Sequence, residues 1–346
     1  MATAERGEHG VSTVSTIDYH TAGEPFRIVT DGLPEIPGET VPDRREFALS
    51  SPEIDHYRQL LVQEPRGHAD MYGGFIVPPD DPGADFGVLF WHKDGYSTAC
   101  GHGTIALGVW AVEHRVVLAE PDGETDVVID VPSGRVRATV TCRAGAVIGA
   151  TFVNVPSWAI ARALPVETPF GTVEADVSYG GAIYASVPAS AFGLEVTPEH
   201  YTALIAAGRA VKWALNDSPA AQHPDDPRLS GIYGTILYDD LGRTAEGPHQ
   251  RNVTVFADGE VDRSPCGSGT SARLPLLVED GLLGDGETLT HDSIVGTRFT
   301  ARVRERVVVA GRSAVVPEVT GRASMTGEHR FVLREDDEVG TGFTLR

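Results

Sequence analysis

The chain has 346 residues, of which 41% are hydrophobic and 22% charged, and its formal net charge is -21. This composition is that of a globular protein, long enough for two domains that each bury a core. The negative charge argues against nucleic-acid backbones and anionic membrane surfaces as partners, because both attract basic patches.

The N-terminal segment, residues 1–14, is polar and carries charges of both signs, so it lacks the apolar core of a signal peptide. The longest apolar run, residues 104–112, is about half the roughly 20 residues that cross a bilayer. These features predict a loose N-terminal arm on a cytoplasmic protein.

The first half of the chain is predicted to run helix, strand, Cys-Gly turn, helix, strands. A helix starts near Ser51, where a capping hydroxyl precedes a proline. A strand ends near Phe90, and a Cys-Gly-His-Gly-Thr turn begins at Cys100. Residues 104–112 are apolar on every face, so as a helix they must be surrounded by protein. Residues 127–140 alternate between polar and apolar, which is the period of strands.

The second half repeats this order. A helix starts near Thr197, a strand ends near Phe256, and a Cys-Gly-Ser-Gly-Thr turn begins at Cys266. Each phenylalanine lies ten positions before its cysteine. The helix that follows contains Pro275, which can kink it, and residues 299–309 alternate as strands do.

The repeat predicts the domain organisation. An Asp-Gly-Glu-Thr sequence also recurs, at residues 122–125 and 285–288. A duplicated unit of this size normally folds as two similar domains across a pseudo-two-fold axis, with equivalent residues meeting at the cleft. We expect an α+β fold in which each domain is a curved, mainly antiparallel sheet around a central helix. The expected N-terminal domain covers residues 12–155 and is completed by residues 335–346, and the C-terminal domain covers residues 156–334.

The two cysteine turns suggest chemistry. A cysteine that opens a helix lies among unpaired N–H groups at the positive helix end, so its thiol pKa is expected below the free value of about 8.5. If the halves bring Cys100 and Cys266 together, their sulfurs approach opposite faces of one substrate α-carbon. Inversion of a stereocentre needs a base on one face and an acid on the other. The N–H groups that would hold the substrate carboxylate belong to Gly101, His102, Gly267 and Ser268.

The alternative reading of these cysteines is structural. Most free cysteines are small buried hydrophobic residues, and an odd number at wide spacing forms neither a disulfide framework nor a zinc site. For Cys142, in an alternating run, we expect a plain strand residue. The matching surroundings of Cys100 and Cys266 favour function for that pair.

Other kinds of site are less well supported. A metal site built from His20, His68 and His102 has no supporting spacing. A pyridoxal phosphate enzyme needs a Schiff-base lysine, and Lys93 and Lys212 lie in no recognisable cofactor motif. The glycine turns are not followed by the Gly-Lys-Ser/Thr of a nucleotide loop. We therefore expect no metal and no cofactor.

The residues around both cysteines, with the block from Arg66 to Gly73, resemble the proline racemase family. The resemblance runs from about Asp18 to the C-terminus. It implies a diaminopimelate-epimerase-like fold of two α/β domains, an imino-acid substrate, no cofactor, and a homodimer in many members. It also implies that Cys100 and Cys266 are the acid/base pair. Further site residues that it implies are Asp262 at the ring nitrogen, Gly101, His102, Gly267 and Ser268 at the carboxylate, and Tyr72 and Phe256 in the pocket wall.

The family contains more than one activity. Its members include proline racemases, 4-hydroxyproline 2-epimerases and trans-3-hydroxy-L-proline dehydratases, and the dehydratases carry threonine at the second cysteine position. Cys266 favours a racemase or epimerase of proline or 4-hydroxyproline, because inversion needs a proton donor on the second face. The segments around Arg66, Tyr233 and Phe256 are more similar to the dehydratases. Elimination of water from trans-3-hydroxy-L-proline stays as the alternative, and a non-catalytic imino-acid-binding protein as a third hypothesis.

Overall fold

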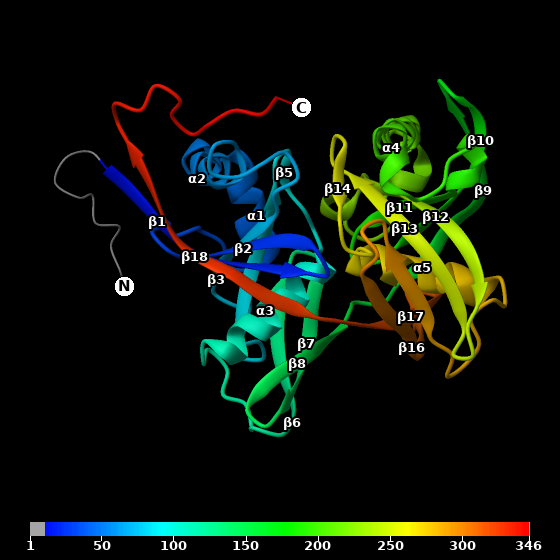
Figure 1. Cartoon of the computed structure of the whole chain (residues 1–346), viewed down its shortest axis with the longest axis horizontal. Helices are drawn as coiled ribbons and strands as arrows, with labels where there is room; N and C mark the ends of the chain where they lie inside the picture. Colours follow the sequence, from blue (N-terminus) through cyan, green and yellow to red (C-terminus); the bar gives the residue numbers. More distant parts are fainter. Residues whose placement is uncertain (1–10, 346) are drawn as a thin grey trace.

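A computed structural model describes residues 11–345 of the chain. Figure 1 shows two lobes, each with strands curved around one helix. Helix α3 (Gly101–Glu113) lies within the sheet of the N-terminal half, and α5 (Gly267–Glu279) lies within the sheet of the C-terminal half. The architecture is therefore α+β, with one central helix in each half, as expected.

The strands of the N-terminal half follow each other in the sheet with the pairing antiparallel, antiparallel, parallel, antiparallel, parallel, antiparallel, antiparallel. In sheet order they are β18 (Ala323–Arg334), β1 (Val11–Thr21), β2 (Glu24–Asp31), β3 (Gly73–Val77), β4 (Phe86–His92), β6 (Gly123–Val131), β7 (Gly134–Arg143) and β8 (Ala146–Val153).

The C-terminal half repeats the same series of pairings, so the duplication seen in the sequence is present in the strand topology. Strands β8 and β17 pair antiparallel and join the two sheets. In sheet order the strands of this half are β9 (Trp158–Thr168), β10 (Gly171–Tyr179), β11 (Ile183–Pro188), β12 (Ile232–Arg243), β13 (Pro248–Phe256), β15 (Leu289–Ser293), β16 (Arg298–Val309) and β17 (Arg312–Gly321).

Helices on the outer faces also correspond. The pair α1 (Val41–Ser50) and α2 (Pro52–Val62) packs against β4, and α4 (Tyr201–Leu215) packs against β12 and β13. Ser51 caps α2 as predicted, accepting a hydrogen bond from the backbone N–H of Ile54. The remaining short elements are β5 (Gly95–Tyr96), β14 (Glu260–Asp262), and the 3-10 turns η1 (Ala189–Phe192), η2 (Pro198–His200), η3 (Pro219–Ala221) and η4 (Pro227–Leu229).

Strand β18 differs from the sequence-based domain boundaries. It pairs with β1 and runs back across Figure 1 to the N-terminal half, although residues 323–334 were expected in the C-terminal domain. The topology explains this, because β18 occupies in the first sheet the position that β9 occupies in the second. The following tail also lies on the N-terminal half, where Phe343 forms a bridge with Glu64. We accordingly propose domains of residues 11–155 with 323–345, and 156–322.

The N-terminal arm is shorter than expected. Residues 11–14 belong to strand β1 because they pair with β18, and the Val14 side chain is buried; residues 1–10 lie outside the described residues. Across residues 11–345, no helix has both the length and the apolar character needed to span a membrane.

The interior is organised around α3. Its residues from Gly101 to Ala111 are all buried, as their apolar character predicted. It packs against β7 and β8 on one side and β1 and β18 on the other. Burial of side chains such as Leu107 contributes about 1.5–3 kcal/mol each. In the equivalent helix α5, Pro275 is accommodated within the helix, which continues to Glu279. Both central helices therefore hold their first turns in fixed positions.

Candidate active site

Both central helices begin at a cysteine. Cys100 is the N-cap of α3, and its Sγ accepts a hydrogen bond from the Gly103 N–H at 3.2 Å. Cys266 is the N-cap of α5, and its Sγ accepts from the Gly269 N–H at 3.4 Å. The two turns differ in backbone conformation, because Cys266 has a φ of 62° and Cys100 a φ of -153°. A non-glycine residue with positive φ is strained, which is a common feature of functional sites.

The two helix N-termini face each other directly. A β-carbon on Gly101 would lie 2.5 Å from the Gly267 Cα and 2.7 Å from the Ser268 nitrogen. A β-carbon on Gly267 would lie 2.6 Å from the Gly101 Cα. Only glycine allows the backbones to approach this closely. The structure thus brings the two predicted turns together.

His102 links Cys100 to Asp262. The Cys100 Sγ is 3.5 Å from the His102 Nδ1, which is 3.7 Å from the Asp262 Oδ2. The other carboxylate oxygen of Asp262 accepts hydrogen bonds from the Ser264 N–H at 2.8 Å and the Ser264 hydroxyl at 2.7 Å. Both cysteines are enclosed, since Cys100 is 4% exposed and Cys266 is 5% exposed. The predicted residues therefore form one buried cluster.

The expected direction of the thiol pKa shifts was wrong. Burial raises the pKa of Cys100 well above its usual value, and the charges of Asp262 and Cys266 raise it further, while the hydrogen bond from Gly103 lowers it. Burial likewise raises the pKa of Cys266, with Asp262 as the next cause. The helix N-terminus does favour the thiolate. However, a thiolate removed from water loses more solvation free energy than one N–H hydrogen bond restores. Burial therefore favours the protonated form of both thiols.

An aromatic wall borders the cysteines. Tyr72 and Phe256, both predicted, have ring centroids 5.8 Å apart, and the Tyr72 ring is 5.0 Å from that of His102. Tyr233 stacks on Phe256 at 5.6 Å, and Tyr184 contacts Tyr233 at 5.7 Å. Sequence reasoning assigned no site role to Tyr184 or Tyr233. The repeat could have indicated Tyr233, because a Tyr-Gly pair lies at the start of both β3 and β12, as Tyr72-Gly73 and Tyr233-Gly234.

The tyrosine hydroxyls are linked by hydrogen bonds. The Tyr72 hydroxyl bonds to the hydroxyl of Ser97 and lies 3.0 Å from that of Tyr233. The Tyr184 hydroxyl is 2.7 Å from the Ser268 Oγ and 3.9 Å from the Cys266 Sγ. Burial raises the pKa of Tyr72, Tyr184 and Tyr233 well above their usual values. The wall therefore presents neutral hydroxyls beside the thiols.

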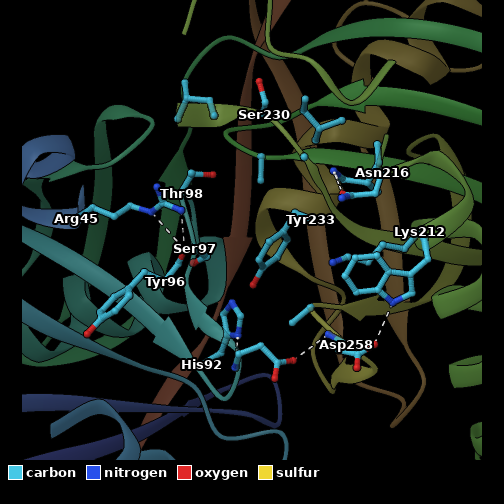
Figure 2. A pocket seen from close by; sticks show the side chains of 18 residues that line it. Arg45, His92, Tyr96, Ser97, Thr98, Lys212, Asn216, Ser230, Tyr233 and Asp258 are labelled. Atoms are coloured by element: carbon cyan, nitrogen blue, oxygen red, sulfur yellow. Dashed lines mark hydrogen bonds between the residues drawn. The ribbon is translucent and has the colours of Figure 1, made fainter. Parts of the chain in front are cut away.

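A cavity of about 300 Å³ lies between the halves, and Tyr233 is among the residues that line it (Figure 2). Neither Cys100 nor Cys266 lines it. Ser97 and Arg45 come from the N-terminal half, and Lys212 and Tyr233 from the C-terminal half. Ser97 and Tyr233, which are linked through the Tyr72 hydroxyl, thus lie in the wall of this cavity.

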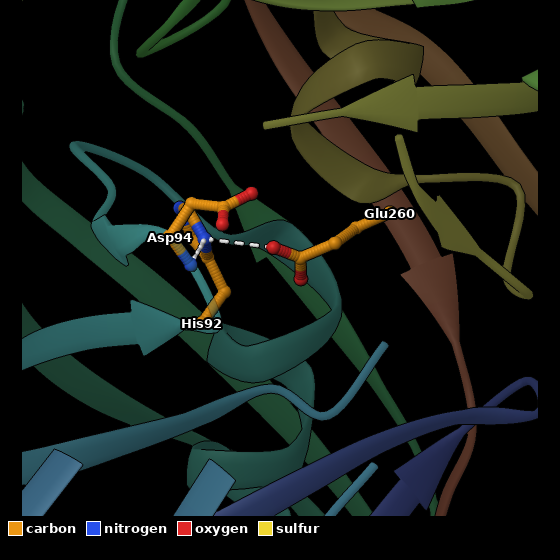
Figure 3. A group of neighbouring side chains, drawn as sticks. All are labelled: His92, Asp94 and Glu260. Atoms are coloured by element: carbon orange, nitrogen blue, oxygen red, sulfur yellow. Dashed lines mark hydrogen bonds and ion pairs between the residues drawn. The ribbon is translucent and has the colours of Figure 1, made fainter. Parts of the chain in front are cut away.

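A group of charged residues connects the halves beside this cavity, which His92 and Asp94 also line (Figure 3). The His92 Nδ1 is 3.2 Å from the Glu260 Oε1, and Asp94 completes a set whose ligand-type atoms lie within 4.8 Å of one another. Such a set can hold a metal ion. Here the Lys93 ammonium is 2.8 Å from the Asp94 Oδ1 and 4.0 Å from the Glu260 Oε1. Because Lys93 already supplies the positive charge, we interpret the group as an ionic link across the cleft.

A further set of contacts between the halves holds the segment before Cys266. Glu24, in the N-terminal half, accepts a hydrogen bond from the Arg263 N–H at 2.7 Å, and Asp70 pairs with the Arg263 guanidinium at 2.7 Å. Asp70 also accepts from the Val261 N–H at 3.1 Å. Burial raises the pKa of Glu24, and the charge of Asp262 raises it further. Glu24, which the sequence did not single out, and Asp70, to which sequence reasoning assigned no role, thus hold the segment that carries Asp262.

His291 contacts the Cys266 turn through Thr270. Its Nδ1 is 2.8 Å from the Thr270 hydroxyl, which donates to the Pro265 carbonyl at 3.0 Å. Asn252 donates to the same carbonyl at 2.8 Å. His291 is fully buried, and this burial lowers its pKa to about 3.

The lowered pKa of His291 predicts a loss of stability in acid. In the unfolded chain a histidine has a pKa of about 6.5, so its contribution is complete above that pH and is lost as the pH falls toward 3. Over this whole range the loss of free energy of unfolding is on the order of 5 kcal/mol, of which roughly half falls between pH 6.5 and 4.5. Urea unfolding at several pH values between 7 and 4.5 measures it. The His291→Gln variant should show a flatter pH dependence, whereas replacement of the exposed His114 by glutamine should leave the slope unchanged. Equal slopes for all three proteins would contradict this assignment.

Comparisons of the sequence with known proteins agree on one family. The sequence model described as proline racemase matches residues 16–344. The chain is 45% identical over 337 residues to a 3-hydroxyproline 2-epimerase of Burkholderia multivorans, covering 96% of this chain and 98% of that protein. It is 46% identical over 335 residues to a trans-3-hydroxy-L-proline dehydratase of Burkholderia cenocepacia, with the same coverage.

The structural comparison agrees. A hydroxyproline epimerase from Agrobacterium vitis, solved with bound trans-4-hydroxy-L-proline, superposes with a TM-score of 0.89 at 32% identity, covering 96% of each chain. A PhzF-family protein from Bacillus anthracis shares only the fold, with a TM-score of 0.56 at 11% identity. The resemblance inferred from the cysteine motifs is therefore confirmed.

Proposed function

The chain belongs to the proline racemase family, and from this premise we propose that it inverts C2 of a hydroxyproline, with Cys100 and Cys266 as the proton-transferring pair. The observation that carries the proposal is the pair of thiols held at two helix N-termini that touch through Gly101 and Gly267. The relatives named as hydroxyproline epimerases support the substrate class.

Each residue has a role in the proposed reaction. The N–H groups of Gly101, His102, Gly267 and Ser268 bind the carboxylate, because two helix N-termini converge there. One thiolate removes the α-proton from C2, and the opposite thiol donates its proton to the other face. The first sulfur ends protonated and the second ends as a thiolate, so the roles exchange for the reverse direction. Neither step needs a group other than these side chains, which supports a cofactor-independent reaction.

The raised thiol pKa values couple deprotonation to binding. The negative charge of Asp262 raises the pKa of both Cys100 and Cys266. A substrate ring nitrogen bound as a cation beside Asp262 would offset that charge. The thiolate therefore forms most readily when the substrate is bound. The same closed pocket keeps water away from the carbanion.

Dehydration of trans-3-hydroxy-L-proline is the second candidate, supported by the dehydratase among the relatives. One thiolate suffices to remove the α-proton before the C3 hydroxyl leaves. The residue at position 266 favours inversion, since a cysteine can donate the second proton and the threonine of typical dehydratases donates poorly.

An exchange experiment in D2O separates these functions. The protein is incubated with L-proline, trans-4-hydroxy-L-proline and trans-3-hydroxy-L-proline while NMR follows the α-proton, optical rotation follows C2, and absorbance follows the cyclic imine. Deuterium uptake with formation of the opposite epimer is expected for at least one hydroxyproline. Imine without the epimer would favour the dehydratase, and no exchange with any of them would leave an imino-acid-binding protein.

The same proposal includes a homodimer, which the family resemblance implies, and a cytoplasmic location, which the polar N-terminal segment predicts. Light scattering after size-exclusion chromatography measures the mass in solution, and a monomer would overturn that part alone.

A further inference from the structure

This inference rests on the proposed function. In that reaction the three substituents of the planar carbon C2 point in three different directions. In the planar carbanion, the carboxylate, the nitrogen and C3 lie in one plane around C2, with a sulfur on each side. The carboxylate points to the helix ends at Gly101 and Gly267, and the nitrogen points to Asp262. The remaining direction, taken by C3, is assigned to the aromatic wall, because the Tyr72 ring lies 5.0 Å from that of His102.

The hydroxyls of Tyr72, Tyr233 and Ser97 have unused hydrogen-bonding capacity. Three hydroxyl groups carry three protons, but only two hydrogen bonds join them. The third proton has one other acceptor, the Ala99 carbonyl, which is 3.4 Å from the Ser97 Oγ and is therefore a weak partner. If Ser97 uses it, the Tyr233 oxygen is left as an acceptor without a donor.

A ring hydroxyl suits this cluster in either proton arrangement, because it both donates and accepts. The plain CH₂ group of proline does neither, so proline would leave this hydrogen-bonding capacity unused. Sites that hydrogen-bond a substrate hydroxyl reject the analogue without it strongly, because a buried polar group is left unpaired. The phenols also remain neutral, since burial keeps their protons on.

We infer that Tyr233, held by Tyr72 and Ser97, binds the C3 hydroxyl of the substrate and makes 3-hydroxyproline the preferred ring. Tyr233 is well placed for this because its ring is fixed by Phe256 on one side and Tyr184 on another. Figure 2 shows it between the residues contributed by the two halves, so it reaches this position only when the halves are together.

Substitution of the hydroxyl tests the inference. The Tyr233→Phe variant keeps the ring and its packing, and removes only the oxygen. The ratio of kcat/KM for trans-3-hydroxy-L-proline to that for L-proline, measured by α-proton exchange in D2O, should fall about tenfold or more relative to the parent protein. The Ser97→Ala variant, which removes the far end of the cluster, should lower the ratio in the same direction by a smaller factor.

Tyr238→Phe provides a matched control. Tyr238 lies on the same strand as Tyr233, but its ring packs under the Arg273 guanidinium at 4.1 Å, and it should keep the parent ratio. An unchanged ratio for Tyr233→Phe overturns the inference, whether both rates stay normal or fall together. If that variant does not fold, an unchanged ratio for Ser97→Ala has the same meaning. A parent protein that exchanges no imino acid at all contradicts the proposed function instead.

Discussion

Replacement of Cys266 by serine should reduce inversion by about 10³-fold or more, because a serine hydroxyl is a far weaker acid than a thiol and serves poorly as proton donor or base near neutral pH. The change is nearly isosteric and preserves the N-cap hydrogen bond to Gly269. The positive φ at this position is retained, so folding should be little affected. Polarimetry with the preferred hydroxyproline measures the loss. The Cys100→Ser variant should lose inversion to a similar degree.

The two variants should differ in what they retain. With Cys266 replaced, the thiolate of Cys100 can still exchange the α-proton of the one epimer that presents it to that face. With Cys100 replaced, exchange should be confined to the other epimer. NMR in D2O with each pure epimer distinguishes them. Cys142→Ser, a buried change in strand β7, is the control and should invert normally. Normal inversion by the Cys266→Ser protein would refute the two-thiol mechanism.

The features that the sequence predicted are those that depend on neighbouring residues. The helix starts at Ser51, Cys100 and Cys266 follow from local capping and glycine patterns, and the alternating strands follow from their period. The repeat then placed the two cysteines at one cleft without any knowledge of long-range contacts. This local information, together with the family resemblance, was sufficient for the fold class and for the centre of the site.

The features that the sequence did not predict depend on how the halves meet. Tyr184 and Tyr233 lie together because β11 and β12 pair, and Tyr233 meets Tyr72 of the other half. Glu24 becomes a site neighbour only through Arg263 of the other half. The thiol pKa shifts had the wrong sign for the same reason. A helix end is visible in the sequence, but the burial that outweighs it at Cys100 is a property of the closed assembly.

The contact between the helix ends predicts a second large effect. In Gly101→Ala the new β-carbon would lie 2.5 Å from the Gly267 Cα and 2.7 Å from the Ser268 nitrogen, which are backbone atoms that cannot move aside. The two helix N-termini must therefore separate by about 1 Å. A misplacement of this size costs about 10²-fold in rate, because both sulfurs must reach one carbon. Steady-state kinetics of the variant should show this loss mainly in kcat.

A glycine outside the cleft separates this effect from a general loss of stability. Gly327→Ala, in strand β18, meets only the flexible His329 side chain at 3.2 Å, so its rate should stay within about twofold of the parent. Urea unfolding of both variants shows whether they remain folded under assay conditions. If folded Gly101→Ala inverts at the parent rate, the helix ends need not touch for catalysis. The close approach of Gly101 and Gly267 would then serve packing of the two halves, and the carboxylate would have to be bound elsewhere.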